Sequence, residues 1–307
     1  MSSIITITPN PCVDKSTIIA GLQPDKKLRC SKPKFEPGGG GINVSRAIHK
    51  LKGTSLAIYP AGGLTGIFLN KLLQEENIES IVIDTKDNTR ENFIVVDELT
   101  NNQYRFCMPG PLLQENEWQG CLRAIESLRD VEYIVASGSL SPGVPEDFFG
   151  RIAVIAKNKK AKLILDTSGE PLRYALDKGV YLWKPNLSEL SFYSGSAELT
   201  TDTAVEAAKK IITGGMAEVI IISLGAAGAM LITKNITERF ATPVVHRKST
   251  VGAGDSMVAG IVLSLSNGKT LSEAVRYGVA SGTAAAMNPG TELCKPGDVE
   301  ALYKASM

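Results

Sequence analysis

The chain has 307 residues, of which 43% are hydrophobic and 21% are charged, a size that suits one large globular domain with a small appendage. Its net charge of +1 gives no electrostatic argument for binding nucleic acid or an anionic membrane, and the basic run 157–162 is expected to be a solvated helix end. Five scattered cysteines and only two histidines argue against a disulfide framework and a structural zinc site.

The first residues, MSSIITITPNPCVDK, lack the basic start and long apolar stretch of a signal peptide, so we expect a cytoplasmic protein. Residues 4–8 predict a strand. Apolar residues at helical spacing predict a helix from about 41 to 51, ending near Gly53, and the next strand and helix are expected at 55–59 and 65–76. Further strands are predicted at 133–137, 162–166, 180–183 and 219–223. The apolar region 219–232 is short for a membrane span and is broken by glycines.

This alternation of strands and helices predicts an α/β fold with a mostly parallel sheet covered by helices on both faces. Two segments break the rhythm: residues 12–36 are polar and extended, and residues 88–107 have the pattern of a hairpin that turns at 100–102. We predict that they form a small discontinuous β lid over a main domain made of residues 1–11, 37–87 and 108–307.

Glycine and polar clusters follow the predicted strands one after another. In open α/β sheets ligands bind outside the carboxyl ends of the strands, so these clusters are expected to share one edge. Ordinary strand-to-helix turns also favour Gly, Ser and Asn, which explains some of the clusters without any ligand. The clusters are TPNP, PAGG, SGSL, DTSGE, KPN and SLG.

The segment STVGAGDSM, residues 249–257, precedes an apolar helix. Its glycines allow a sharp turn, and the free N–H groups of the first helical turn make an anion site that suits a phosphoryl group. Asp255 is then placed to accept a proton from an attacking hydroxyl, although it is also a candidate helix cap. Because it lies at a helix N-terminus, we expect its pKa to be lowered.

Two other segments carry candidate site residues. PGGGGINVSRA, residues 37–47, brings four glycines to a helix start, either as a flexible hinge or to let the backbone approach a ligand, with Asn43 near a polyol hydroxyl. KPNLSEL, residues 184–190, pairs Asn186 with Glu189 as a capping box, and Glu189 is also placed to face a hydrated Mg²⁺. A Walker loop and a dinucleotide fingerprint are both absent from the sequence. Basic residues of the lid could form a site for a phosphate carried by the acceptor: Lys27, Arg29, Arg90 and Arg105.

Together these motifs resemble the ribokinase-like sugar kinases, specifically the phosphofructokinase B family. STVGAGDSMVAG is the specific motif, supported by PGGGGINVSRA, ITPNPCVD and KPNLSEL, and the resemblance covers essentially the whole chain. KLRCSKPKFEPGGGGINVSRAI and YRFCMPG are most similar to the minor bacterial 6-phosphofructokinase branch, whereas TPNPCVD is more similar to the opening of 1-phosphofructokinases and tagatose-6-phosphate kinases.

The resemblance implies a ribokinase-like fold, ATP and Mg²⁺ as cofactors, K⁺ as an additional ion, and a homodimer formed through the lids. It implies Asp255 as catalytic base and an anion hole of Gly252, Ala253 and Gly254. It places at the acceptor Asp14, Lys27, Arg29, Gly39, Asn43, Arg90, Arg105 and Ser139, with Arg29 able to reach a neighbouring subunit's site. It places at ATP Lys184, Asn186, Ser223, Gly225, Gly228, Thr250 and Thr283. It places at the metal ions Glu189 for Mg²⁺ and Ser249, Val251 and Asn288 for K⁺.

The implied reaction is transfer of the ATP γ-phosphoryl group to the 1-hydroxyl of fructose 6-phosphate. Tagatose 6-phosphate and fructose 1-phosphate are alternative acceptors for the same chemistry, and an unphosphorylated sugar or a nucleoside is a more distant one. An idle sugar-phosphate sensor is the alternative from another class of protein.

Overall fold

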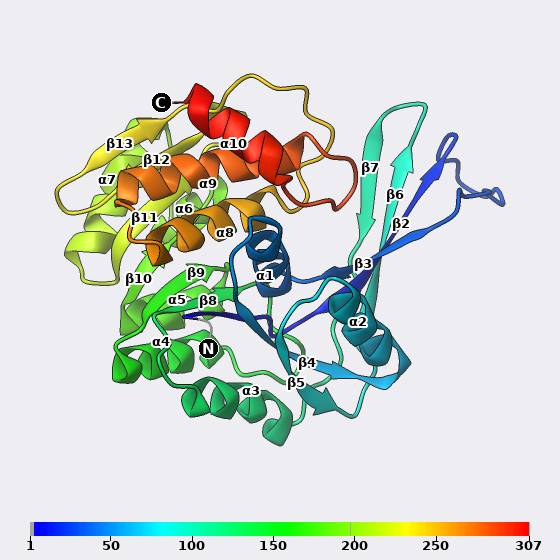
Figure 1. The fold of residues 1–307 in the computed structure, drawn as a ribbon, viewed down its shortest axis with the longest axis horizontal. Helices are drawn as coiled ribbons and strands as arrows, with labels where there is room; N and C mark the ends of the chain where they lie inside the picture. The colour runs from blue at the N-terminus through cyan, green and yellow to red at the C-terminus, as the bar shows by residue number, and fades with distance from the viewer. Residues whose placement is uncertain (1–2, 197, 307) are drawn as a thin grey trace.

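A computed structural model of the chain describes residues 3–196 and 198–306, which form two β-sheets flanked by helices. The larger sheet has nine strands in the order β13-β12-β11-β10-β9-β8-β1-β4-β5 (Figure 1). Their bounds are β1 Ile4–Ile7, β4 Leu56–Gly62, β5 Ser80–Thr85, β8 Tyr133–Ser137, β9 Lys162–Asp166, β10 Val180–Trp183, β11 Ala217–Ser223, β12 Ala229–Ile232 and β13 Thr237–Phe240.

In this sheet β5, β4, β1, β8, β9, β10 and β11 are neighbours that pair in parallel. This confirms the mostly parallel sheet that the sequence predicts. Strands β12 and β13 add an antiparallel edge, which the alternation of strands and helices did not predict. In these two strands the chain turns back by short connections and has no room for a crossover helix, which a parallel strand would need.

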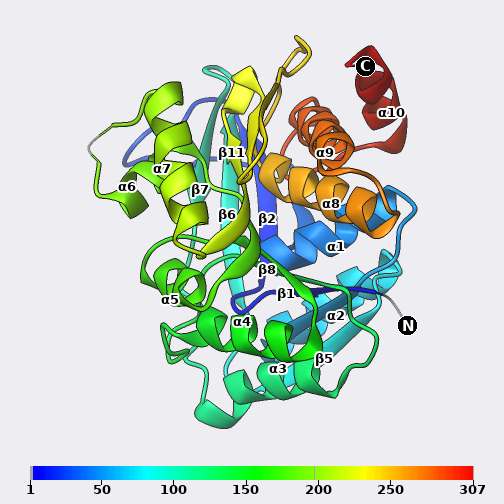
Figure 2. The same cartoon turned by 90° about the vertical axis from the view of Figure 1, so that its left-hand side faces the viewer.

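Helices cover both faces of this sheet (Figures 1 and 2). One face packs against helices of the middle of the chain, whose apolar side chains include Trp118, Phe148 and Leu172. The helices are α3 Glu115–Ser127, α4 Phe148–Lys159, α5 Glu170–Lys178, α6 Leu187–Ser194 and α7 Thr201–Thr213. The other face packs against α1 Gly40–Lys50, α8 Ala253–Ser266, α9 Leu271–Ala286 and α10 Pro296–Ala305. Helix α2, Gly63–Glu75, packs through Leu69 and Leu73 in a third, smaller core.

Helix α8 is apolar on nearly every side because it lies between the sheet, α1 and α9, and most of its residues are buried. Its sequence therefore shows no polar face from which its orientation could be read. None of the helices among the described residues combines the length and apolarity needed to cross a lipid bilayer.

A second sheet of four strands stands off the main sheet (Figure 1). Its order is β3-β2-β6-β7, with bounds β2 Cys12–Ile19, β3 Lys34–Gly38, β6 Arg90–Asp97 and β7 Asn102–Phe106. Its strands come from the two segments that break the alternation in the sequence, joined across the central parallel pair of β2 and β6. We call this sheet the lid; its role as a separate domain stays a prediction.

Candidate active site

The candidate site lies at the carboxyl ends of β1 and β8. From β1 the sheet continues to β4 and β5 on one side and to β8, β9, β10 and β11 on the other, so the strand order reverses between β1 and β8. Such a reversal opens a crevice in which ligands bind. Asn10, after β1, donates from its side-chain nitrogen to the hydroxyl of Ser139, after β8, over 3.3 Å.

The N-terminus of α8 meets this crevice. Gly252 is the N-cap residue with φ 72°, and a Cβ there would stand 2.7 Å from a methyl carbon of Leu293. The next N–H groups have no acceptor inside the helix, although that of Ala253 lies 3.4 Å from the backbone oxygen of Thr250. A turn of this kind is suited to binding an anion. Gly254 is exposed, and a Cβ on it would stand 3.7 Å from the ammonium nitrogen of Lys184. A buried cation therefore faces the amide groups of the turn.

Asp255, in the first turn of α8, accepts a hydrogen bond of 2.9 Å from the side-chain nitrogen of Asn43 on α1. Removal from water and the nearby carboxylate of Asp166 raise the pKa of Asp255 to about 7, against the opposing effects of Asn43 and Lys184. The expected lowering of this pKa is therefore wrong. The helix N-terminus, which favours the ionised carboxylate, can be read from the sequence. Burial and the carboxylate of Asp166 cannot be read from it, and together they disfavour the ionised form more strongly.

Asp166 ends β9 and forms an ion pair of 3.0 Å with Lys184, which follows β10. Burial alone would lower the pKa of Lys184, but the Asp166 carboxylate outweighs this effect and raises the pKa. Lys184 is therefore a permanent cation beside the anion site. Asp166 was not among the residues predicted for the site. The sequence did contain a signal for it, because this acid ends the apolar run KLILD and belongs to the cluster DTSGE at the predicted sheet edge.

The glycine run 38–41 allows the start of α1 to approach β1 and β8 closely. A Cβ on Gly40 would stand 2.1 Å from the Ser137 hydroxyl oxygen, and one on Gly41 would stand 2.5 Å from the backbone oxygen of Ile7. Gly39 has φ 114°, and a Cβ there would stand 2.5 Å from a methyl carbon of Thr8. These contacts favour close backbone packing over a flexible hinge as the reason for the glycines.

Polar side chains of the lid lie next to residues of the main domain. Asp14 on β2 is buried and accepts a 3.0 Å hydrogen bond from Asn92 on β6. Arg90 donates to the backbone oxygens of Met108 and Asn10, each over 2.9 Å, and its Nε is buried without a partner among the described residues. Arg105 on β7 reaches the hydroxyl of Thr250, 3.5 Å away. Three of the predicted acceptor residues therefore lie on lid strands, and the two arginines contact residues of the main domain.

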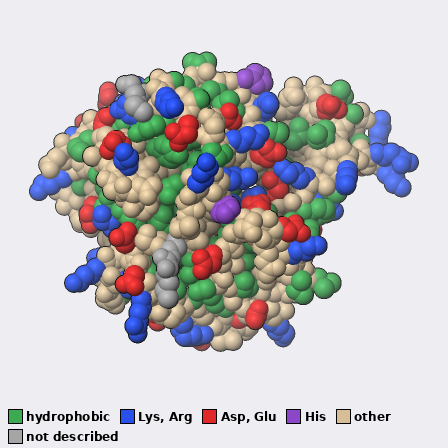
Figure 3. All heavy atoms as spheres, in the orientation of Figure 1, with side chains coloured by type: hydrophobic (Ala, Val, Ile, Leu, Met, Phe, Trp, Pro, Cys, Tyr) green, Lys and Arg blue, Asp and Glu red, His purple; other side chains and the backbone are tan. Residues whose placement is uncertain are grey.

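Lys27 and Arg29 lie elsewhere in this chain. They are exposed in the loop between β2 and β3, which is the far end of the lid, where Figure 3 shows basic side chains gathered. One chain alone does not bring them to Asp14 and Arg90. Any role at the acceptor stays a prediction that requires a second subunit.

The predicted ATP residues follow β10, β11 and the loops beside them. Asn186 and Glu189 form the capping box of α6, with both hydrogen bonds at 2.8 Å. Ser223 ends β11 and bridges to Asn186, and Gly225 begins the short 3₁₀ turn after it. Gly228, with φ 96°, packs where a Cβ would stand 1.8 Å from the backbone oxygen of Phe240. Thr283 is buried in α9 and donates to the Val279 backbone oxygen.

The predicted K⁺ residues lie on two linked loops. Ser249 donates from its hydroxyl to the backbone oxygen of Gly290 over 2.7 Å, and the Val251 N–H donates to the Ser249 hydroxyl. Asn288 is buried and donates to the backbone oxygens of Ala284 and Leu293. Across residues 3–196 and 198–306 no group of three or more His, Cys, Asp or Glu side chains is arranged to hold a metal ion.

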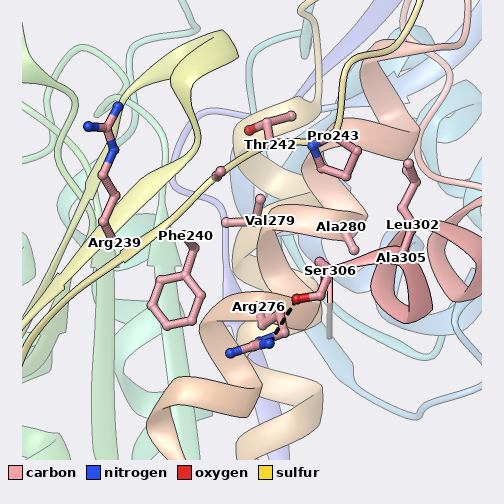
Figure 4. Close-up of a pocket in the computed structure, with 11 residues that line it drawn as sticks. Arg239, Phe240, Thr242, Pro243, Arg276, Val279, Ala280, Leu302, Ala305 and Ser306 are labelled. Atoms are coloured by element: carbon pink, nitrogen blue, oxygen red, sulfur yellow. Dashed lines mark hydrogen bonds between the residues drawn. The ribbon is translucent and has the colours of Figure 1, made fainter.

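A cavity of about 290 Å³ lies between β13, α9 and α10. Figure 4 shows Val279, Ala280 and Leu302 along its wall, with Arg276 donating to the backbone oxygen of Ser306. The lining contains none of the predicted site residues. We therefore separate this cavity from the crevice that holds Asp255.

Residues 3–297 match the sequence profile of the pfkB family carbohydrate kinases. The chain belongs to this family.

Similar proteins include two named ATP-dependent 6-phosphofructokinase isozyme 2. One, from Mycobacterium tuberculosis, is 43% identical over 98% of this chain and 89% of its own length, and one, from Escherichia coli K12, is 41% identical over 99% and 98%. A 1-phosphofructokinase from Bacillus subtilis is 35% identical over 94% and 95%. The crystal structure of the E. coli phosphofructokinase-2 with potassium has a TM-score of 0.96 at 41% identity, covering 99% of each chain. A ribokinase from Thermotoga maritima has a TM-score of 0.79 at 23% identity, so the ribokinase-like fold is confirmed.

Proposed function

We propose that the chain is a 6-phosphofructokinase that transfers the ATP γ-phosphoryl group to the 1-hydroxyl of fructose 6-phosphate, giving fructose 1,6-bisphosphate. The observation that carries this proposal is Asp255, hydrogen-bonded by Asn43, beside the amide groups of α8 and the ammonium group of Lys184. The relatives of highest identity reported above are 6-phosphofructokinases, and the E. coli phosphofructokinase-2 has been solved with fructose-6-phosphate.

In this mechanism Asp255 accepts the hydroxyl proton of the acceptor as the phosphoryl group moves. Its pKa of about 7 suits a general base near neutral pH, because about half of such groups are ionised there and the ionised form binds a proton well. The N–H groups of Gly252, Ala253 and Gly254, with Lys184, stabilise the charge on the phosphoryl oxygens. The acceptor hydroxyls meet Asp14, Gly39 and Asn43, and its phosphate meets Arg90, Arg105 and Ser139.

The remaining predicted residues bind ATP and ions. Asn186, Ser223, Gly225, Gly228, Thr250 and Thr283 line the nucleotide site. Glu189 keeps one carboxylate oxygen in its capping box, so Mg²⁺ would take most of its ligands from phosphates and water, the arrangement this ion prefers, and would neutralise phosphate charge. K⁺ would lie by the linked loops of Ser249, Val251 and Asn288, and the E. coli structure in complex with potassium supports a site for this ion.

The proposed assembly is a homodimer formed through the lids. Five apolar side chains on or beside the lid are 41–73% exposed: Ile18, Leu22, Leu99, Phe106 and Met108. If the lids of two chains packed against each other, Lys27 and Arg29 of the partner subunit would lie near the acceptor. The E. coli phosphofructokinase-2 has also been solved in a tetrameric inhibited form, so a dimer can be a unit of a larger assembly. We keep the cytoplasm as the expected location.

The test of the substrate is ADP release measured over fructose 6-phosphate, tagatose 6-phosphate, fructose 1-phosphate, ribose and adenosine. We expect fructose 6-phosphate to give the highest kcat/KM. A higher kcat/KM for another sugar phosphate would identify that compound as the acceptor instead. No ADP release with any of the compounds would favour a sensor without catalytic activity.

Arg90 separates phosphorylated from unphosphorylated acceptors. Replacing it with alanine removes a charge-assisted contact to the acceptor phosphate, so KM for fructose 6-phosphate should rise about 10- to 100-fold. The exposed Arg123 on α3, changed to alanine, is the control and should leave KM unchanged. Equal effects of the Arg90 change on ribose and adenosine would argue for an unphosphorylated substrate.

A further inference from the structure

Arg46 is a buried arginine in α1, one turn after Asn43, and none of the motifs assigns it a role. Its side chain is 3% exposed. Its Nε and one terminal nitrogen donate to the two carboxylate oxygens of Glu76, over 2.7 and 2.6 Å. The other terminal nitrogen donates to the backbone oxygen of Pro37 over 2.8 Å and contacts the side-chain oxygen of Asn43 at 3.3 Å.

This last contact decides how the Asn43 amide is turned. An arginine only donates hydrogen bonds and stays charged, so the atom of Asn43 that faces it must be the carbonyl oxygen. The opposite end of the amide, the NH₂ group, then faces Asp255 at 2.9 Å. Reversing the amide would set NH₂ against a guanidinium and a carbonyl oxygen against a carboxylate. Both contacts would then be repulsive.

The anchors of Arg46 come from two elements, the end of α2 and lid strand β3. Glu76 follows the last turn of α2, Pro37 belongs to lid strand β3, and Glu36 on the same strand lies 3.8 Å from the guanidinium. Thr291 donates its hydroxyl to Glu36. A bidentate arginine with three separate acceptors cannot swing away from Asn43 without losing several charge-assisted hydrogen bonds.

We propose that Arg46 is a positioning residue that fixes the Asn43 amide so that its NH₂ group donates to the Asp255 carboxylate. This inference rests on the proposed function, in which Asp255 is the base. The hydrogen bond favours the ionised carboxylate, so Arg46 sets the pH range in which the base is ready. The other charged groups around Asp255 are Asp166, Lys184 and Asp14, and the anchors add Glu36 and Glu76.

The test is the pH dependence of kcat/KM for the Arg46→Lys variant. Lysine keeps the positive charge, but its single nitrogen cannot reach Glu76, Pro37 and Asn43 together. The freed amide should lose its fixed orientation, its hydrogen bond to Asp255 should weaken, and the acid limb of the profile should move up by up to about one pH unit. Activity at pH 6.5 should fall roughly tenfold and recover near pH 9, which loss of folded enzyme would not reproduce.

The same change in an Asn43→Ala background shows whether the effect passes through the amide. Without the amide, Arg46→Lys should leave the acid limb where Asn43→Ala alone puts it. An unshifted limb in the single variant, or an equal further shift in the double variant, would overturn the proposal. If Arg46→Lys fails to fold, Glu76→Gln weakens the main anchor and should give a smaller upward shift. Wild-type turnover of fructose 6-phosphate tests the proposed function separately.

Discussion

At the scale of single residues, the chemistry depends on how Asp255 is surrounded. Burial and the carboxylate of Asp166 favour the protonated acid, while the hydrogen bond from Asn43 and the charge of Lys184 favour the anion, and the balance places the pKa at about 7. A solvent-exposed carboxylate at a helix start would instead have a lowered pKa. The side chain is therefore held in a state that costs stability and favours proton transfer.

This balance predicts how stability depends on pH. Between the ordinary pKa of an aspartate and about pH 7, Asp255 is protonated in the folded protein and ionised in the unfolded chain. The free energy of unfolding therefore falls as the pH rises through this window. Asp255→Asn removes the effect. The variant should be more stable than the wild type by roughly 1–3 kcal/mol at pH 8, and the difference should shrink toward pH 5. Denaturant unfolding at the two pH values measures it. A difference that grows on acidification would contradict the raised pKa.

At the scale of elements, several parallel strands were predictable, whereas strand β5 and the contacts between elements were not. Strands β8, β9 and β10 match the predicted residues 133–137, 162–166 and 180–183, because buried parallel strands are short apolar runs with clear ends. The antiparallel edge of β12 and β13 was missed.

In the candidate site too, the local motifs could be predicted and the contacts between distant segments could not. Its glycine turn and its acid could be read from STVGAGDSM, because local backbone geometry demands those residue types. The pair of Asn43 and Asp255 joins residues 212 positions apart, and no local pattern records such a distance. The pKa of Asp255 was predicted in the wrong direction for the same reason, because burial and Asp166 come from other elements.

The start of α8 gives a prediction at this scale. Alanine at Gly252 would hold φ near 72° at a cost of about 1–2 kcal/mol and would press on Leu293, so the amide groups should shift. We expect kcat to fall at least tenfold, with a smaller change in KM. Gly268, after α8, is the control: its φ is 75° and a Cβ there would meet no atom within 4 Å. Its alanine variant should lose comparable stability in thermal unfolding and keep wild-type kcat. Equal loss of kcat in both variants would remove the special role of Gly252.

At the scale of the whole molecule, the lid leaves apolar surface uncovered in a single chain. Ile18 is 47% exposed on β2 and shares a strand face with Asp14. A contiguous apolar patch on such a protein marks an interaction site, so these side chains are candidates for a partner surface. Closing the lids of two chains over each other would both bury that surface and complete the acceptor site.

Changing Ile18 to lysine tests this assembly. A charge in an apolar interface should weaken association, and sedimentation velocity should show a shift toward the monomer. Because Lys27 and Arg29 of the partner subunit would be lost, KM for fructose 6-phosphate should rise as well. Ile236, 38% exposed between β12 and β13, is the matched control, and its lysine variant should change neither quantity. An unchanged assembly in the Ile18 variant would place the interface elsewhere.

The central claim is that Asp255 is the base of an ATP-dependent phosphoryl transfer to a sugar phosphate. Steady-state ADP release by Asp255→Asn with fructose 6-phosphate, at pH 8, tests it most directly. The account predicts a fall in kcat of about 100- to 10,000-fold in a protein that remains folded, because general-base removal has that effect. Turnover close to the wild-type rate would contradict the account.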